Sequence, residues 1–228
     1  GDVIIYSKEY IIASNCSNGS YSGGYQLGMY EIKTGKAIKY FDTSDKFNSI
    51  SLSNDKLSLV CASGEDKNVQ IFDINTRKRK DVIHIGFPVY HAELSRDNKK
   101  LICSGYSYEL QIWDVSTKGL IKGFPIEITF TQSGESMSQI HSFSLSKDRR
   151  YIAIPEHYNK QVSIWNVETG ECIQQIPCGE YVKYANFNLN NNKLIIADYY
   201  GVGIYEFPLL DPEHSQVLKS LPPLVNDD

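Results

Sequence analysis

The stretch Leu110-Gln111-Ile112-Trp113-Asp114 decides the fold of this chain, because its pattern occurs four more times. The pattern is an apolar residue, any residue, an isoleucine or similar residue, an aromatic residue, and then an acid, or in one copy an amide. The other copies begin at Leu27, Val69, Val162 and Val202. Alternation of apolar and polar residues with a period of two is typical of strands with one buried face. The sequence therefore predicts five related strands.

The spacing of the five copies indicates what unit is repeated. The aromatic residues stand 42, 41, 52 and 40 residues apart, and they are Tyr30, Phe72, Trp113, Trp165 and Tyr205. A period of about 40 to 45 residues is typical of four-stranded β-propeller blades. The one long interval contains an insertion, residues 127–137.

Two further elements recur around each copy of the pattern. A polar turn such as Leu94-Ser95-Arg96-Asp97 lies upstream and is followed by an apolar run, which predicts a strand, a turn and a second strand. A second turn, such as Glu168-Thr169-Gly170, follows the aromatic residue in four of the five units and leads into a fourth strand. The chain is thus expected to be all-β, with four-stranded antiparallel units at about 2–41, 47–84, 88–125, 138–177 and 181–221 and a tail at 222–228.

With these elements in this order, nearly the whole chain resembles the WD-repeat family, and Trp113-Asp114 is the family's own dipeptide. The resemblance implies a β-propeller that serves as a binding platform for a protein or peptide. The family's usual Gly-His ahead of the first strand is missing in every unit, and the aspartate usual in the turn between second and third strands has a counterpart only at Asp66. The chain therefore resembles a divergent member.

The number of units leaves two alternatives for closure of the propeller. Seven blades are usual in the family, and such rings close so that no sheet edge stays open. Five units imply either a five-bladed ring or a part of a longer propeller. The second alternative is the expected one, because five-bladed closure is uncommon.

Composition and charge restrict the function classes. Hydrophobic residues make up 41% of the 228 residues and charged residues 22%, as expected of a globular protein. The formal net charge of −4 disfavours nonspecific binding of nucleic acid or of an anionic membrane surface. No apolar stretch has the length of a membrane helix, and the beginning of the chain does not have the pattern of a signal peptide.

The cysteines indicate the compartment. There are five, an odd number without a Cys-x-x-Cys pair, and Cys61 and Cys103 lie in apolar strand-like runs. This pattern predicts reduced thiols in an intracellular protein, in the cytoplasm or alternatively in the nucleus.

The sequence contains no recognisable catalytic constellation. The five histidines occur singly, without the spacing that presents two ligands to one metal ion. His141 and Ser142 are neighbours on an expected strand, where adjacent side chains point to opposite faces. No nucleophile elbow, phosphate loop or dinucleotide fingerprint is present. We expect no enzyme activity, no cofactor and no metal; a propeller enzyme remains the alternative from another class.

The run Arg77-Lys78-Arg79-Lys80 is the one dense basic cluster. One interpretation is a patch for nuclear import, nucleic acid or phosphoinositide. The other is a solvated outer strand whose charges prevent edge pairing, and the shortness of the run favours it.

Tyrosines in the expected loops are the main candidates for binding. Tyrosine combines a large apolar surface with a polar tip and is enriched at binding hot spots. The loops between second and third strands and those between blades emerge on one face of a propeller, together with the insertion at 127–137. Acidic neighbours in these loops predict a bias toward cationic partners. The alternative is that several tyrosines fill the core between blades, as the strand-end residues Tyr90 and Tyr181 would. The predicted partner-binding residues are Tyr106, Tyr108, Glu109, Glu156, Tyr158, Tyr181, Tyr199 and Tyr200.

Overall fold

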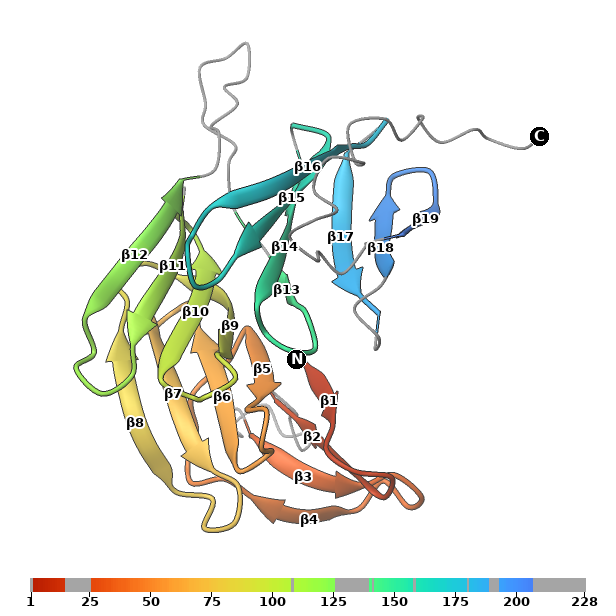
Figure 1. The fold of residues 1–228 in the computed structure, drawn as a ribbon. Coiled ribbons are helices and arrows are strands. Elements are labelled where there is room, and N and C mark those ends of the chain that lie inside the picture. Colours follow the sequence, from red (N-terminus) through yellow and green to blue (C-terminus); the bar gives the residue numbers. More distant parts are fainter. Residues whose placement is uncertain are drawn as a thin grey trace. The chain divides into compact units, whose positions relative to one another are not determined.

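The computed structural model confirms an all-β fold built from propeller blades (Figure 1). It describes residues 2–14, 26–107, 109–125, 140, 142–157, 159–179, 181–188 and 193–206. These residues form five antiparallel sheets in sequence order, four with four strands and the fifth with three described strands. The chain divides into two compact units, Gly1–Ser142 with three sheets and Phe143–Asp228 with two.

We call the sheets blades 1 to 5. Blade 1 contains β1 (Val3–Ile5), β2 (Tyr10–Ala13), β3 (Gly28–Glu31) and β4 (Ala37–Tyr40). Blade 2 contains β5 (Ser49–Leu52), β6 (Ser58–Ser63), β7 (Asn68–Asp73) and β8 (Arg79–His84). Blade 3 contains β9 (Val89–Leu94), β10 (Lys100–Gly105), β11 (Glu109–Asp114) and β12 (Leu120–Pro125).

The second unit follows the same plan. Blade 4 contains β13 (Ser144–Leu145), β14 (Tyr151–Glu156), β15 (Gln161–Asn166) and β16 (Cys172–Pro177). Blade 5 contains β17 (Val182–Phe187), β18 (Lys193–Asp198) and β19 (Val202–Glu206). The fourth strand expected for blade 5 would fall after residue 206, outside the described residues. The five copies of the repeat pattern are the third strands β3, β7, β11, β15 and β19.

The acid or amide that ends the repeat pattern closes the next turn. Oδ1 of Asp114 accepts hydrogen bonds from the backbone N–H of Thr117 at 2.7 Å and of Ser116 at 2.9 Å, and from both hydroxyls. These bonds stabilise the carboxylate and lower the pKa of Asp114 to about 2, with the Thr117 amide as the largest cause. Asp73 and Asn166 accept equivalent bonds in blades 2 and 4.

The fourth residue after this acid or amide has a left-handed backbone. Its N–H donates to the backbone carbonyl of the acid or amide at 2.7–2.9 Å in blades 1 to 4. The residues are Gly35, Arg77, Lys118 and Gly170, with φ of 67°, 61°, 58° and 69°. Glycine adopts this conformation without a steric penalty, which explains the recurring Thr-Gly pair in blades 1 and 4.

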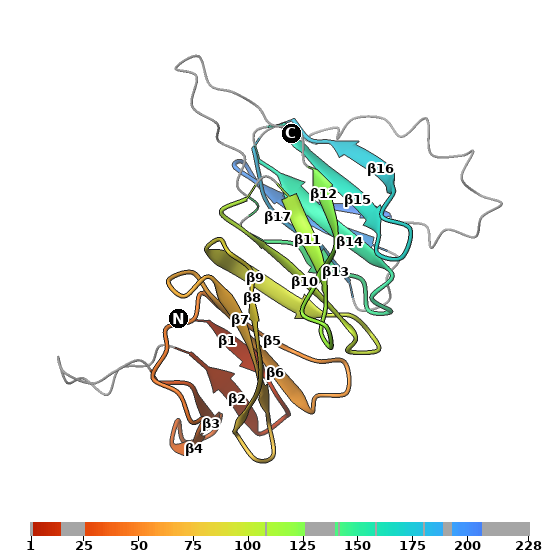
Figure 2. The ribbon, with the colours of Figure 1, turned by 90° about the vertical axis from the view of Figure 1, so that its left-hand side faces the viewer.

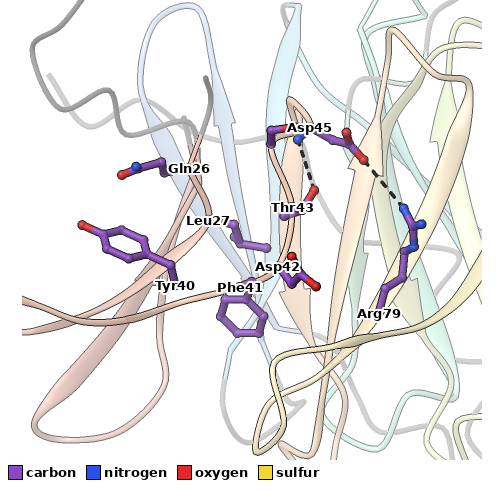
Figure 3. A pocket seen from close by; sticks show the side chains of 9 residues that line it. Gln26, Leu27, Tyr40, Phe41, Asp42, Thr43, Asp45 and Arg79 are labelled. Atoms are coloured by element: carbon purple, nitrogen blue, oxygen red, sulfur yellow. Dashed lines mark hydrogen bonds and ion pairs between the residues drawn. The ribbon is translucent and has the colours of Figure 1, made fainter. Parts of the chain in front are cut away.

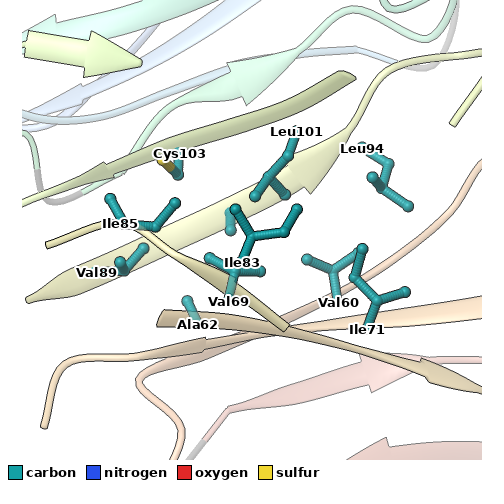
Figure 4. Packing of buried hydrophobic residues seen from close by; sticks show 11 residues of the cluster. Val60, Ala62, Val69, Ile71, Ile83, Ile85, Val89, Leu94, Leu101 and Cys103 are labelled. Atoms are coloured by element: carbon teal, nitrogen blue, oxygen red, sulfur yellow. The ribbon is translucent and has the colours of Figure 1, made fainter. Parts of the chain in front are cut away.

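Strand β6 shows how the blades of the first unit pack. Its residues alternate between two hydrophobic clusters: Leu59 and Cys61 pack toward blade 1, whereas Val60 and Ala62 pack toward blade 3. Figure 4 shows the second of these clusters, in which Val69 and other residues of blade 2 meet residues of blade 3. Both faces of β6 are therefore buried, and the strand reads as a continuous apolar run.

The second unit repeats this packing. Val162 and Ile164 of β15 lie in one cluster with Val182 of β17 and with Leu194 and Ile196 of β18. In both units the inner strand of one blade packs against the blade before it. β9 lies mainly against β5 and β6, beside blade 2 in Figure 2, and β17 lies mainly against β14.

The equivalent face of β19 is open to solvent. Val202 and Ile204 occupy the same positions in the repeat pattern as Val69 and Ile71. Val69 is 0% exposed under blade 3, whereas Val202 is 69% exposed. The identity of the residue is the same; blade 3 packs against blade 2, whereas no strand after β19 is among the described residues.

This contrast predicts different costs for one substitution. We expect Val69→Asp to lower the free energy of unfolding by about 3 kcal/mol or more, because it places a charge in an apolar cluster. The matched Val202→Asp should change it by no more than about 0.5 kcal/mol. Urea denaturation followed by tryptophan fluorescence measures both. Equal destabilisation by the two substitutions would contradict the packing described above.

Candidate functional site

The structure describes six of the eight predicted partner-binding residues. Tyr108 and Tyr158 lie outside the described residues, as does the insertion at 127–137. Tyr106 and Glu109 belong to the first unit, and the others belong to the second. The two groups are therefore considered one at a time.

In the first unit, Tyr106 is held at the end of β10 by a close backbone approach. Its N–H donates to the carbonyl of Pro88 at 2.9 Å, and its side chain is exposed. The preceding residue must be glycine, because a Cβ on Gly105 would lie 2.0 Å from the same carbonyl oxygen. Glu109 follows at the start of β11 and is half-buried.

In the second unit, Tyr181 is part of a small stack. Its ring lies parallel to that of His157, with the centroids 5.1 Å apart, and Nζ of Lys160 lies 5.1 Å from its centroid. A ring nitrogen of His157, Nδ1, is 3.0 Å from the carbonyl oxygen of Val182. This contact fixes the imidazole, so His157 supports Tyr181.

Tyr199 and Tyr200 lie beside this stack, because the register of blade 5 pairs Val182 with Asp198. The two rings are 67% and 78% exposed and meet edge to face with centroids 5.4 Å apart. Oδ1 of Asp198 accepts from the N–H of Tyr200 and of Gly201, both at 2.9 Å, which fixes the turn.

Lys183 contributes a cation that was not predicted as part of the binding surface. A register shift lies between Val182 and Tyr184, so Lys183 occupies an irregular position in β17. Its Nζ lies 5.3 Å from the centroid of Tyr199. We call the set formed by Lys160, Tyr181, Lys183, Tyr199 and Tyr200 the lysine–tyrosine patch.

Glu156 is directed into the protein. The residue is 7% exposed, and Oε2 accepts hydrogen bonds from Asn159 at 2.9 Å and from Gln161 at 2.7 Å. Its carboxylate thus joins the end of β14 to the start of β15. The second unit therefore presents lysines over tyrosine rings, whereas the sequence suggested acidic groups beside them.

A cavity of about 570 Å³ in the first unit was not identified from the sequence (Figure 3). The segment between β4 and β5 forms one side of it and contributes Asp42 and Asp45. Asp45 accepts a hydrogen bond from Gln70 at 2.7 Å and lies 3.9 Å from the Arg79 guanidinium. Tyr40 lies at the other end. The carboxylates of Asp42 and Asp45 in the connecting segment are the sequence feature from which this cavity could have been suspected.

The basic run is partly used inside the first unit. Arg79 donates to Oε1 of Gln70 at 3.2 Å besides its contact with Asp45. Arg77 takes the left-handed turn position described above. These roles give the run a structural function in blade 2.

Metal-binding and membrane-spanning features are absent from the described ranges. These ranges contain no group of three or more His, Cys, Asp or Glu side chains placed to hold a metal ion. They also contain no helix with the length and apolar character needed to cross a bilayer.

Comparison of the sequence with protein-family models and with curated proteins finds no match. The WD-repeat resemblance therefore depends on the internal repeat alone.

The described cysteines are free thiols in distinct environments. Cys61 and Cys103 are buried, Cys172 is exposed, and Cys178 is half-buried. Burial raises the pKa of Cys178 to about 11, with a further contribution from the charge of Asp198. Burial also raises the pKa of the other three thiols.

Because the thiolate is the reactive form, these environments predict an order of alkylation. With iodoacetamide at pH 8, Cys172 should react faster than Cys178, and Cys61 and Cys103 should react only after unfolding in urea. Peptide mapping by mass spectrometry measures each site. Labelling of Cys61 or Cys103 in the native protein at the rate of Cys172 would refute this assignment.

The internal role of Glu156 can be tested by truncation. Glu156→Ala should lower the free energy of unfolding by about 2 kcal/mol, because it leaves two amides without their buried acceptor. Glu171→Ala, at an exposed position in the same unit, is the control and should change it by less than about 0.5 kcal/mol. Urea denaturation compares them, and an unchanged stability of Glu156→Ala would show that the bonds contribute nothing.

Proposed function

We propose that the chain is a scaffold of the WD-repeat type that binds a protein or peptide partner through the lysine–tyrosine patch. The observation that carries the proposal is the pair Tyr199 and Tyr200, which expose most of their surface although their turn is fixed by Asp198. Rigid, exposed aromatic side chains lose little conformational entropy on binding.

The position of the patch supports the same role. Tyr181 ends the loop between blades 4 and 5, and Tyr199 and Tyr200 form the turn between β18 and β19. Binding residues are often found on loops that a rigid scaffold positions. Tyr106 and Glu109 of the first unit, with Tyr108 and Tyr158, stay predicted parts of the binding surface.

We also propose that the protein acts inside the cell and that it is not an enzyme. The sequence has no catalytic motif, and its isolated histidines do not form a constellation for acid-base chemistry. The odd number of cysteines and the free thiols of the described ones agree with a reducing compartment, the cytoplasm or alternatively the nucleus.

The test uses peptides selected against the protein itself. A library of random 12-residue peptides displayed on phage is selected on the immobilised full chain, and labelled peptides are then measured by fluorescence anisotropy. We expect the Tyr199→Ser/Tyr200→Ser variant to weaken binding by at least about tenfold, as for truncation of hot-spot aromatics.

The control is Tyr40→Ser, which removes a partly exposed tyrosine of the first unit and should leave the affinity unchanged. All variants must keep the thermal midpoint of the wild type to within about 3 °C. Peptides that bind the double variant as tightly as the wild type would overturn the proposal.

A further inference from the structure

The geometry points to a partner segment that carries carboxylate side chains, bound by Lys183 beside Tyr199. We infer this chemical class from the environment of Lys183, and the inference rests on the proposed function. The expected partner is a protein that presents an acidic segment, with apolar residues beside the acids.

The charge of Lys183 is not compensated by the described residues. Its side chain is exposed, and it forms no ion pair with any residue that the structure describes. Its contact is the face of Tyr199, which attracts the ammonium group without neutralising it. The ammonium group therefore keeps N–H donors for an acceptor from outside.

The two described acids near the patch in sequence, Asp198 and Glu156, are bonded to other groups. The carboxylate of Asp198 is turned into its own loop, where it accepts two backbone N–H groups. The carboxylate of Glu156 is buried and bonded to two amides. Neither described acid is thus directed at Lys183, although both are close in sequence to the patch.

The ring of Tyr199 lies on one side of the Lys183 ammonium group. Tyr199 and Tyr200 meet edge to face, so they form a corner with apolar faces and hydroxyl donors. A carboxylate beside this corner can accept charge-assisted hydrogen bonds from Lys183 and a bond from a phenol. An apolar neighbour in the same segment can cover the exposed rings.

Nucleic acid is the other class of partner that combines negative charges with rings. Binding of a phosphate backbone requires several cations along its path, and the whole chain has a net charge of −4. Lys183 is one exposed cation, which suits a carboxylate of a short acidic segment better than a run of phosphates. An acidic peptide is therefore favoured.

The experiment compares phage selections on the wild type and on Lys183→Glu, with Lys39→Glu as control because Lys39 is exposed on β4. We expect the wild type and Lys39→Glu to enrich Asp and Glu, and Lys183→Glu to lose this enrichment. Replacing Glu by Gln in a selected peptide should weaken binding to the wild type by about tenfold, the value of a charged hydrogen bond.

Three outcomes would overturn the inference. Selected peptides without acidic enrichment, or peptides that bind Lys183→Glu as tightly as the wild type, would contradict it. A labelled 15-residue oligo(dT) that binds more tightly than any selected peptide and is lost in Lys183→Glu would assign the patch to nucleic acid instead.

Failure of this inference differs from failure of the proposed function. If peptides depend on Tyr199 and Tyr200 but not on Lys183, the scaffold function stands and the acidic partner is refuted. If peptides depend on neither, the scaffold function through this patch fails.

Discussion

The packing of one blade beneath the inner strand of the following blade is the interaction on which the rest of the structure depends. Val69 and Ile71 in the first unit, and Val162 and Ile164 in the second, come from the same positions of the repeat and lie in inter-blade clusters. Because a blade is a single sheet, it can bury both faces only between neighbours. The apolar positions of the repeat pattern recur because each blade must bury them against a neighbouring blade.

The same constraint places the loops where they can act. Once the strands are fixed, the turn after the repeat is closed by its acid or amide, and the opposite ends of the strands carry the variable segments. In blade 5 the register of β17 with β18 puts Tyr181 and Lys183 beside Tyr199 and Tyr200. The arrangement of these tyrosines and of Lys183 is thus a product of strand register.

The strands and turns could be predicted from the sequence because their causes are local. Alternating apolar residues, Ser and Asp side chains that bond in turns, and the Thr-Gly pair each act within a few residues, and the antiparallel sheets follow one another in sequence order as the repeat indicates. The direction of a side chain at a strand end is not local in this sense. Glu156 was expected on the binding surface, and the structure uses its carboxylate to join β14 and β15.

Lys183 could not be selected from the sequence for a related reason. Its position depends on a register shift in β17, and a single exposed lysine carries no signal of such an irregularity. The cavity of blades 1 and 2 likewise depends on how the segment between β4 and β5 lies beside Arg79. In both cases the deciding contact joins residues that are distant in the chain.

The most direct test of the account is a titration of the ¹⁵N-labelled full chain with a selected acidic peptide, followed by amide chemical shifts. We predict that the largest shifts fall at residues 181–184 and 198–201, with little change at 77–80 and 41–45. Shifts concentrated at 77–80 or 41–45, or spread evenly over both units, would contradict it.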